Sequence, residues 1–413
     1  MKNSNIGARD QRNESPCAQE LFEVTEHVFQ VRNSEWSGMS LIEGDRGIIV
    51  VDPLTSADST RDVVSLYRRY RGQRPITGLI HTGAIDETRP IPGDEYQDPE
   101  IPVLTWQEPP LTTGPTITVT GAAQEEEIDG VRILCQLPTA ADAPRGMNFL
   151  LPDFRALHLA ETATTGPSHR THGHILTADT RGRVHDLDEA LTLFADRTDV
   201  AFAAGIRPVW GGDRISDLLA QYRDLHAYLH DQTVRLMGQG LNAAQIAVEL
   251  ALPAPLAETW SRRLHHGTLA DTVEAIVQRY RSSRNDPGEL ADGDESHWAE
   301  TTSTDAIVHA LAIRVDGPRA AESGFTMDWR LTDENQTVRL TLCHGALTHR
   351  HSAIDAPPPE KADLTLTLTK HLLLTMLRGE GINGVDIDGD LQVLGRLLRV
   401  LAPAEPTFAS VGR

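Results

Sequence analysis

A strand–helix–strand unit near the start of the chain limits the folds that the sequence can adopt. Residues 47–52 (GIIVVD) and 76–80 (ITGLI) are short apolar runs, and residues 59–70 between them have helical periodicity. The second run leads into residues 81–90, HTGAIDETRP. An apolar strand that ends in His, Asp and Glu is a common place for a metal site, so this stretch is the first candidate for one.

Strand signals dominate the first half of the chain and helical signals the middle. Strands are expected at 21–31, 39–43, 116–120, 131–137, 147–151, 156–159 and 200–203, and a Pro- and Asp-rich loop at 90–115. Helices are expected at 186–193, 215–237, 242–250, 255–265 and 269–280. After a polar linker, a small domain is expected with strands at 325–331, 337–343, 346–351 and 362–369 and helices at 303–315, 370–378 and 391–401.

Charge and cysteine content exclude several classes of partner. The formal net charge of −21 argues against binding to nucleic acid or to an anionic membrane surface. No run of 18 apolar residues exists, so no membrane span is expected, and the polar first 20 residues do not resemble a secretory signal. Cys17, Cys135 and Cys343 are far apart and form no CxxC pair, which favours a reduced, cytoplasmic location.

Several segments, in their order along the chain, are similar to one known family. They are residues 41–52 (LIEGDRGIIVVD), 143–149 (APRGMNF), 159–161 (LAE), 207–211 (RPVWG), 230–236 (HDQTVRL) and the tail from about residue 303. Through them the chain resembles the alkylsulfatases, a branch of the metallo-β-lactamase superfamily. The resemblance implies an α/β fold: an αββα metallo-β-lactamase-like sandwich at 20–212, a shortened helical, dimerisation-type segment at 213–280, a linker at 281–301 and an α+β sterol-carrier-like domain at 302–413.

Members of this family hold two zinc ions with an H-x-H-x-D-H loop, two further carboxylates and a late His. Carried onto this chain with Asp86 as the anchoring Asp, the two His positions of the first zinc fall on Thr82 and Ala84. The late His falls on Gly205 or Ile206. The resemblance therefore implies that the nitrogen ligands of the first zinc are missing, which disfavours two-zinc hydrolysis of alkyl sulfates.

The same resemblance implies that carboxylates replace the ligands of the second zinc site. Asp86 remains, the His after it is Glu87, and the two family glutamates fall on Asp142 and Glu161. Oxygen ligands suit a hard cation, so one divalent ion (Mg, Mn, Ca, Fe or Zn) is one expectation. The alternative is that these side chains point into solvent and no metal binds.

Residues 168–174 contain the densest group of histidines, His169, His172 and His174. The family uses this segment to hold the sulfate and to protonate the leaving group. Here the histidines are expected either to be exposed on a loop or to serve as a general acid or base. Arg207 is expected to form a salt bridge, or to bind an anionic group of a substrate.

Two functional hypotheses follow for the chain. In the first it is a repurposed enzyme of hydrolase or lyase type that acts on a lipophilic or amphipathic small molecule, with one carboxylate-held metal or metal-free acid/base chemistry. In the second it is a pseudoenzyme that binds a lipophilic ligand or a partner protein. The short helical segment also implies that any homodimer has a reduced interface. His349 and His351 alternate on an expected strand, and we expect them to share one exposed face.

Overall fold

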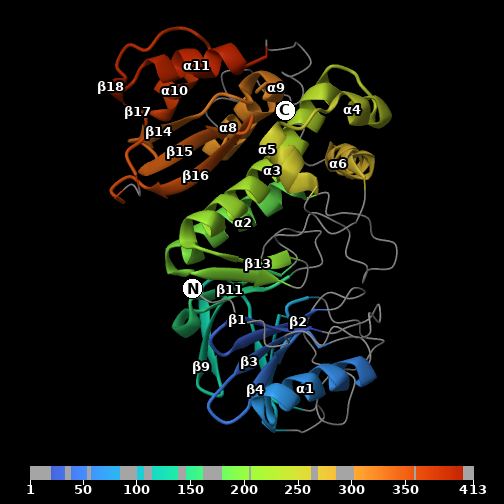
Figure 1. The fold of residues 1–413 in the computed structure, drawn as a ribbon. Helices are drawn as coiled ribbons and strands as arrows, with labels where there is room; N and C mark the ends of the chain where they lie inside the picture. Colours follow the sequence, from blue (N-terminus) through green and yellow to red (C-terminus); the bar gives the residue numbers. More distant parts are fainter. Residues whose placement is uncertain are drawn as a thin grey trace. The chain divides into compact units, whose positions relative to one another are not determined.

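The structure is a computed structural model that describes residues 20–32, 39–53, 57–83, 100–106, 114–137, 146–160, 179–203, 206–261, 268–284, 302–357 and 360–402 (Figure 1). The chain forms two compact units. The first contains Met1–Thr177, His185–Ala220 and Arg263–His266, and the second contains Ala178–Val184, Gln221–Arg262 and Gly267–Arg413. Helices α2 (Thr180–Phe194) and α3 (Gly212–Gly238) contribute residues to both units.

Two mixed sheets form the first unit. The first sheet has the strand order β1 (Glu20–Thr25), β2 (Val28–Arg32), β3 (Ser40–Glu43), β4 (Ile48–Val51), β5 (Ile76–Ile80), β6 (Val103–Thr105) and β7 (Thr116–Thr118). The second has the order β13 (Ile206–Trp210), β12 (Val200–Ala203), β11 (Ala156–His158), β10 (Asn148–Leu151), β9 (Val131–Gln136) and β8 (Gln124–Ile128). Strands β4 to β7 run parallel, so their carboxyl ends lie at one edge.

The core of this unit lies between the two sheets, and helices cover the outer faces. Ile42, Ile49 and Ile80 of the first sheet pack against Ile133 and Phe149 of the second. On the outer face of the first sheet, α1 (Ala57–Arg71) buries Val63, Val64 and Tyr67. On the second sheet, the Gln136 side chain donates to the carbonyl oxygen of Asp186 in α2 over 2.9 Å. The expected αββα sandwich is therefore confirmed.

Helices and one five-stranded sheet form the second unit. The helices are α4 (Ala243–Glu249), α5 (Ala254–Ser261), α6 (Leu269–Arg284), α8 (Thr304–Ile313), α9 (Gly317–Ala320), α10 (Lys370–Leu377) and α11 (Gln392–Val400), together with the second part of α3. The sheet order is β16 (Ala346–Ala353), β15 (Gln336–Cys343), β14 (Phe325–Leu331), β17 (Leu364–Leu368) and β18 (Asp386–Gly389). Leu364, Leu366 and Leu368 of β17 are buried in its core. No described helix is long and apolar enough to cross a membrane.

Two local expectations from the sequence were wrong. Residues 21–31 form a hairpin of two strands, because His27 adopts a positive φ of 66° and reverses the chain. Val103–Thr105, inside the expected 90–115 loop, is the parallel strand β6, and its three residues are buried. Burial in the sheet therefore outweighs the Pro- and Asp-rich surroundings of this short run.

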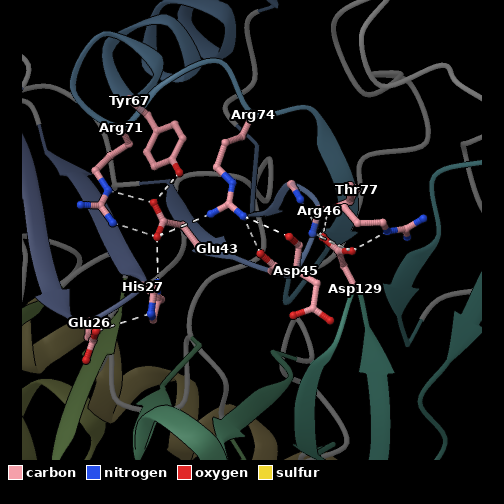
Figure 2. A network of polar contacts seen from close by, with 12 residues as sticks. Glu26, His27, Glu43, Asp45, Arg46, Tyr67, Arg71, Arg74, Thr77 and Asp129 are labelled. Carbon is pink, nitrogen blue, oxygen red and sulfur yellow. Dashed lines mark hydrogen bonds and ion pairs between the residues drawn. The ribbon is translucent and has the colours of Figure 1, made fainter.

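A buried carboxylate holds the end of the first sheet at which β3 finishes (Figure 2). The Glu43 side chain is 3% exposed and accepts hydrogen bonds from Tyr67 Oη (2.6 Å), Arg71 Nε (2.9 Å) and His27 Nδ1 (2.9 Å). Burial alone would raise the pKa of Glu43, but the hydrogen bonds from Arg71, Tyr67 and His27 outweigh it and lower the pKa to about 2. The network therefore ties α1 and the β1–β2 hairpin to β3.

A second carboxylate joins the two sheets at the same end. Asp129 follows β8, and its Oδ2 accepts hydrogen bonds from Gly47 N (2.9 Å) and Thr77 Oγ1 (2.7 Å) of the first sheet (Figure 2). A side chain at Gly47 would meet the Pro75 carbonyl oxygen at 2.3 Å, so glycine is required for this close approach.

Replacing Glu43 with Gln should destabilise the protein in a pH-dependent way. Because the pKa falls from 4.5 to about 2 on folding, the carboxylate contributes stability above pH 4.5 that is lost as the pH falls toward 2. We expect E43Q to lower the free energy of unfolding at pH 7 by about 3 kcal/mol, as measured by urea unfolding. E249Q is the control, because Glu249 is exposed at the end of α4 and takes no part in this network. Equal stability of E43Q and the wild type at pH 7 would contradict this account.

Candidate active site

The candidate active site lies at the edge where the parallel strands β4 and β5 end. Val51 of β4 pairs with Ile80 of β5, so Asp52 and Thr82 leave the sheet at the same edge. The amide of Asp52 donates to the carbonyl oxygen of Ile80 over 2.9 Å, and His81 N donates to Leu104 O over 2.9 Å. This is the edge at which open α/β sheets place their ligands.

Asp52 fixes Thr82, at the start of the HTGAIDETRP stretch. Its Oδ1 accepts from Thr82 N over 2.8 Å, and its Oδ2 accepts from Thr82 Oγ1 over 2.5 Å. The backbone of Asp52 has a φ of 50°, a left-handed conformation that Asp tolerates better than most residues. Thr82 is 3% exposed, so these two bonds are made inside the protein.

Hydrogen bonds connect this loop start to the second sheet. Met147 N, just before β10, donates to Thr82 O over 2.7 Å. The next residue, Asn148, is fully buried; its Nδ2 donates to Gln136 Oε1 over 2.9 Å and its Oδ1 accepts from Ala160 N over 3.0 Å. Hydrogen bonds, together with the peptide bond between residues 147 and 148, therefore join Asp52 and Thr82 to Ala160.

The chain segments that leave these connected residues carry the carboxylates expected at the site. Asp86 and Glu87 lie a few residues after Thr82, Asp142 lies five residues before Met147, and Glu161 follows Ala160 directly. Asp86, Glu87, Asp142 and Glu161, and also His169, His172 and His174, lie outside the described residues. Arg207 lies in β13, but its side chain is outside the described part.

One residue at a first-zinc position can be tested against a zinc ion. The Thr82 hydroxyl, at the position on which the sequence resemblance places an imidazole, donates its hydrogen to Asp52. Thr82 therefore does not fit a zinc ligand, since zinc takes imidazole, thiolate or carboxylate donors. The other two positions fall in residues 84 and 204–206; Ala84 and Gly205 have no side-chain donor atom, and Ile206 has an apolar side chain.

Near Asp52, a buried histidine that the sequence did not single out lies between the sheets. His158 in β11 is 2% exposed, stacks on Phe149 (centroids 4.8 Å apart, 9° between planes) and meets the edge of Phe202. Burial lowers the pKa of His158 to about 4, although the charge of Asp52 opposes this. The ring is therefore neutral at pH 7, and its place between two apolar leucines in the sequence gave no functional signal.

The second unit contains polar clusters of which the sequence predicted only that His349 and His351 share one face of a strand. Among the described residues, the groups with convergent ligand atoms are Asp224 with Cys343 and His344; His230 with Asp231 and His309; and Asp305 with His349 and His351. Their members come from segments that are distant in the sequence, so only the folded chain brings them together.

Comparisons with known proteins agree with this architecture. Residues 293–412 match the family model described as alkyl sulfatase C-terminal. An (R)-specific secondary-alkylsulfatase of Pseudomonas sp is 24% identical over 551 aligned positions, which cover 94% of this chain and 81% of the relative. The chain is a homologue of the alkylsulfatases.

Two further comparisons define the extent of this homology. The alkyl/aryl-sulfatase BDS1 of Saccharomyces cerevisiae is 29% identical over 319 positions, but these cover 63% of this chain and only 48% of the yeast protein. The structure of the stereoselective inverting sec-alkylsulfatase Pisa1 from Pseudomonas sp. matches with a TM-score of 0.53 at 22% identity, covering 94% of this chain and 85% of that one. The alignment with the secondary-alkylsulfatase spans 551 positions, which exceeds the 413 residues of this chain. The secondary-alkylsulfatase therefore contains segments that this chain lacks.

Replacing Asp52 with Asn tests the two hydrogen bonds between Thr82 and Asp52, which we call the Asp52 clamp. Asn tolerates the positive φ, but its amide nitrogen would face one of the two Thr82 donors and its charge is lost. We expect D52N to cost about 2 kcal/mol of unfolding free energy and to speed hydrogen exchange at the Thr82 amide. D62N on the exposed surface of α1 is the control. An unchanged rate of hydrogen exchange at the Thr82 amide would show that the Asp52 clamp does not hold Thr82 in place.

Proposed function

We propose that this alkylsulfatase homologue is an enzyme that acts on an amphipathic small molecule and holds one hard divalent cation with Asp86, Glu87, Asp142 and Glu161. The observation that carries the proposal is the hydrogen-bonded path from Asp52 through Thr82 and residues 147–148 to Ala160. This path supports the convergence of the four carboxylates, because each carboxylate lies on a chain segment next to a residue of the path.

The chemistry of the donor set favours one cation over none. Carboxylates that converge without a cation repel one another and raise each other's pKa, which is costly unless a positive charge is present. Oxygen donors match Mg²⁺, Mn²⁺ or Ca²⁺ better than zinc. When bound, such an ion would supply Lewis-acid activation of water or of a substrate oxygen.

The remaining sequence-derived residues receive supporting roles in this proposal. His169, His172 or His174 would transfer a proton to or from the reacting group, and Arg207 would bind an anionic group of the substrate. The amphipathic substrate class follows from the relatives, whose names describe them as alkylsulfatases and an alkyl/aryl-sulfatase. Two-zinc hydrolysis is disfavoured because Thr82 is committed to Asp52. A cytoplasmic location and a homodimer with a reduced interface stay predictions.

A second function, binding of a lipophilic ligand or partner protein without catalysis, is favoured by the same loss of first-zinc ligands. It differs from the enzyme in one measurable respect. A binding protein does not require the four carboxylates, whereas the proposed enzyme loses both metal and turnover when any of them is removed.

Metal analysis combined with activity assays separates these functions. After equilibration with Mn²⁺ and gel filtration, we expect about one carboxylate-bound ion per chain in the wild type, with that ion absent from D86A and E161Q. Turnover on a panel of alkyl sulfates and amphipathic esters should fall at least about 100-fold in E161Q, while D62N is unaffected. If D86A and E161Q hold as much metal as the wild type and the wild type shows no turnover, the binding function remains, whereas two zinc ions per chain at this site would overturn the proposed donor set.

A further inference from the structure

We propose that Asp305, His349 and His351 of the second unit form a binding site for one divalent transition-metal ion such as zinc. His349 and His351 are alternate residues of β16 and lie on the same face of its strand. Asp305 is in the first turn of α8. The site belongs to the second unit, and it does not depend on the proposed function of the first.

Both ring nitrogens converge on a single carboxylate oxygen. His349 Nε2 lies 2.9 Å and His351 Nε2 lies 2.7 Å from Asp305 Oδ1, and a ligand atom from each residue lies within 4.8 Å of the others. Two imidazoles and one carboxylate that leave further positions open are a recurring metal-binding set. Those positions face water, since the side chains of Asp305, His349 and His351 are 62%, 24% and 33% exposed.

The surroundings of His351 leave its Nε2 available as a ligand. Gln336 Nε2 donates to Glu334, so the carbonyl oxygen of the Gln336 amide faces His351 Nδ1, at 2.9 Å. Because a carbonyl oxygen only accepts, Nδ1 must carry a hydrogen, and in the neutral ring Nε2 then has its lone pair toward Asp305. Two acceptors at 2.7 Å repel one another unless a second proton or a metal ion lies between them.

Residues outside the site fix this orientation of the Gln336 amide. The Glu334 carboxylate also accepts from Thr304 Oγ1 over 2.6 Å and pairs with Lys370 Nζ at 3.0 Å. Thr304 is the residue before Asp305, so one network positions both the helix that carries the carboxylate and the amide that orients His351. Partners that fix the tautomer of a ligating His are typical of metal sites.

The other two clusters lack these features. Asp224 already accepts from Arg223 Nε, Arg223 Nη2 and His344 Nδ1, and the hydrogen bond to Asp224 raises the pKa of His344 to about 10, so this ring has no lone pair at pH 7. In the His230, Asp231 and His309 group, the His230 and Asp231 side chains are only 10% and 8% exposed, which would require an ion to lose most of its water.

Zinc binding to the full-length, chelator-treated protein tests the site, with titration calorimetry and Co²⁺ absorption as readouts. We expect D305A, D305N and H351A to lose one Zn²⁺ equivalent that D86A retains. Q336L, which frees the His351 ring, should weaken binding about 10- to 100-fold. H371A, an exposed His on α10, should bind like the wild type. The positive charge of Arg181 interacts with Asp305 and His349 and repels a bound cation. We therefore expect R181A to bind Zn²⁺ more tightly than the wild type, and the difference should be largest at low salt, where charges are screened least.

The outcomes separate a metal site from a plain ion pair. If D305A, D305N and H351A retain the stoichiometry and affinity of H371A, the proposal is wrong, and the contacts are a His–Asp ion pair. Circular dichroism of each variant shows whether the fold persists, and the isosteric D305N gives the decisive comparison if D305A unfolds. Loss of zinc from D86A but not from D305A would place the ion at the candidate active site instead.

Discussion

The two hydrogen bonds from Thr82 to Asp52 are the interaction on which the candidate site depends. They fix where the chain leaves β5, and the carbonyl oxygen of the same Thr82 receives the amide of Met147 from the other sheet. Through Asn148, the path continues to Ala160. Thr82 and Asn148 together thus link the three chain segments from which the proposed metal ligands come.

Polar side chains fix the strands of the first unit at both ends, with more of the described hydrogen bonds at the end that holds Glu43 and Asp129. At one end of β3 and β4, Glu43 and Asp129 hold a helix, a hairpin and both sheets through several short hydrogen bonds (Figure 2). At the opposite end, two hydrogen bonds join Thr82 to Asp52. A sandwich fixed firmly at one end can keep its backbone in place while the loops at the other end change their side chains, which is how one fold comes to carry different chemistry.

The apolar runs predicted the architecture because burial on both faces leaves a continuous signal, as in Ile48–Val51 and Ile76–Ile80. The prediction failed where tertiary context decides. Gln124–Ile128 reads QEEEI, yet it forms β8 at the sheet edge, where alternate side chains are exposed. Asp305 and His349 are far apart in the sequence, so their contact required the packing of α8 on β16. The candidate carboxylates came from family resemblance, and their geometry stays a prediction.

We propose that a carboxylate site for one hard cation replaces the two-zinc site that the family resemblance implies. Anomalous diffraction from crystals soaked in Mn²⁺ tests it most directly, because the peak position identifies the ligands. We expect one strong manganese peak surrounded by oxygens of Asp86, Glu87, Asp142 and Glu161. Two zinc peaks at this edge of the sandwich, or no manganese peak among these carboxylates, would contradict it.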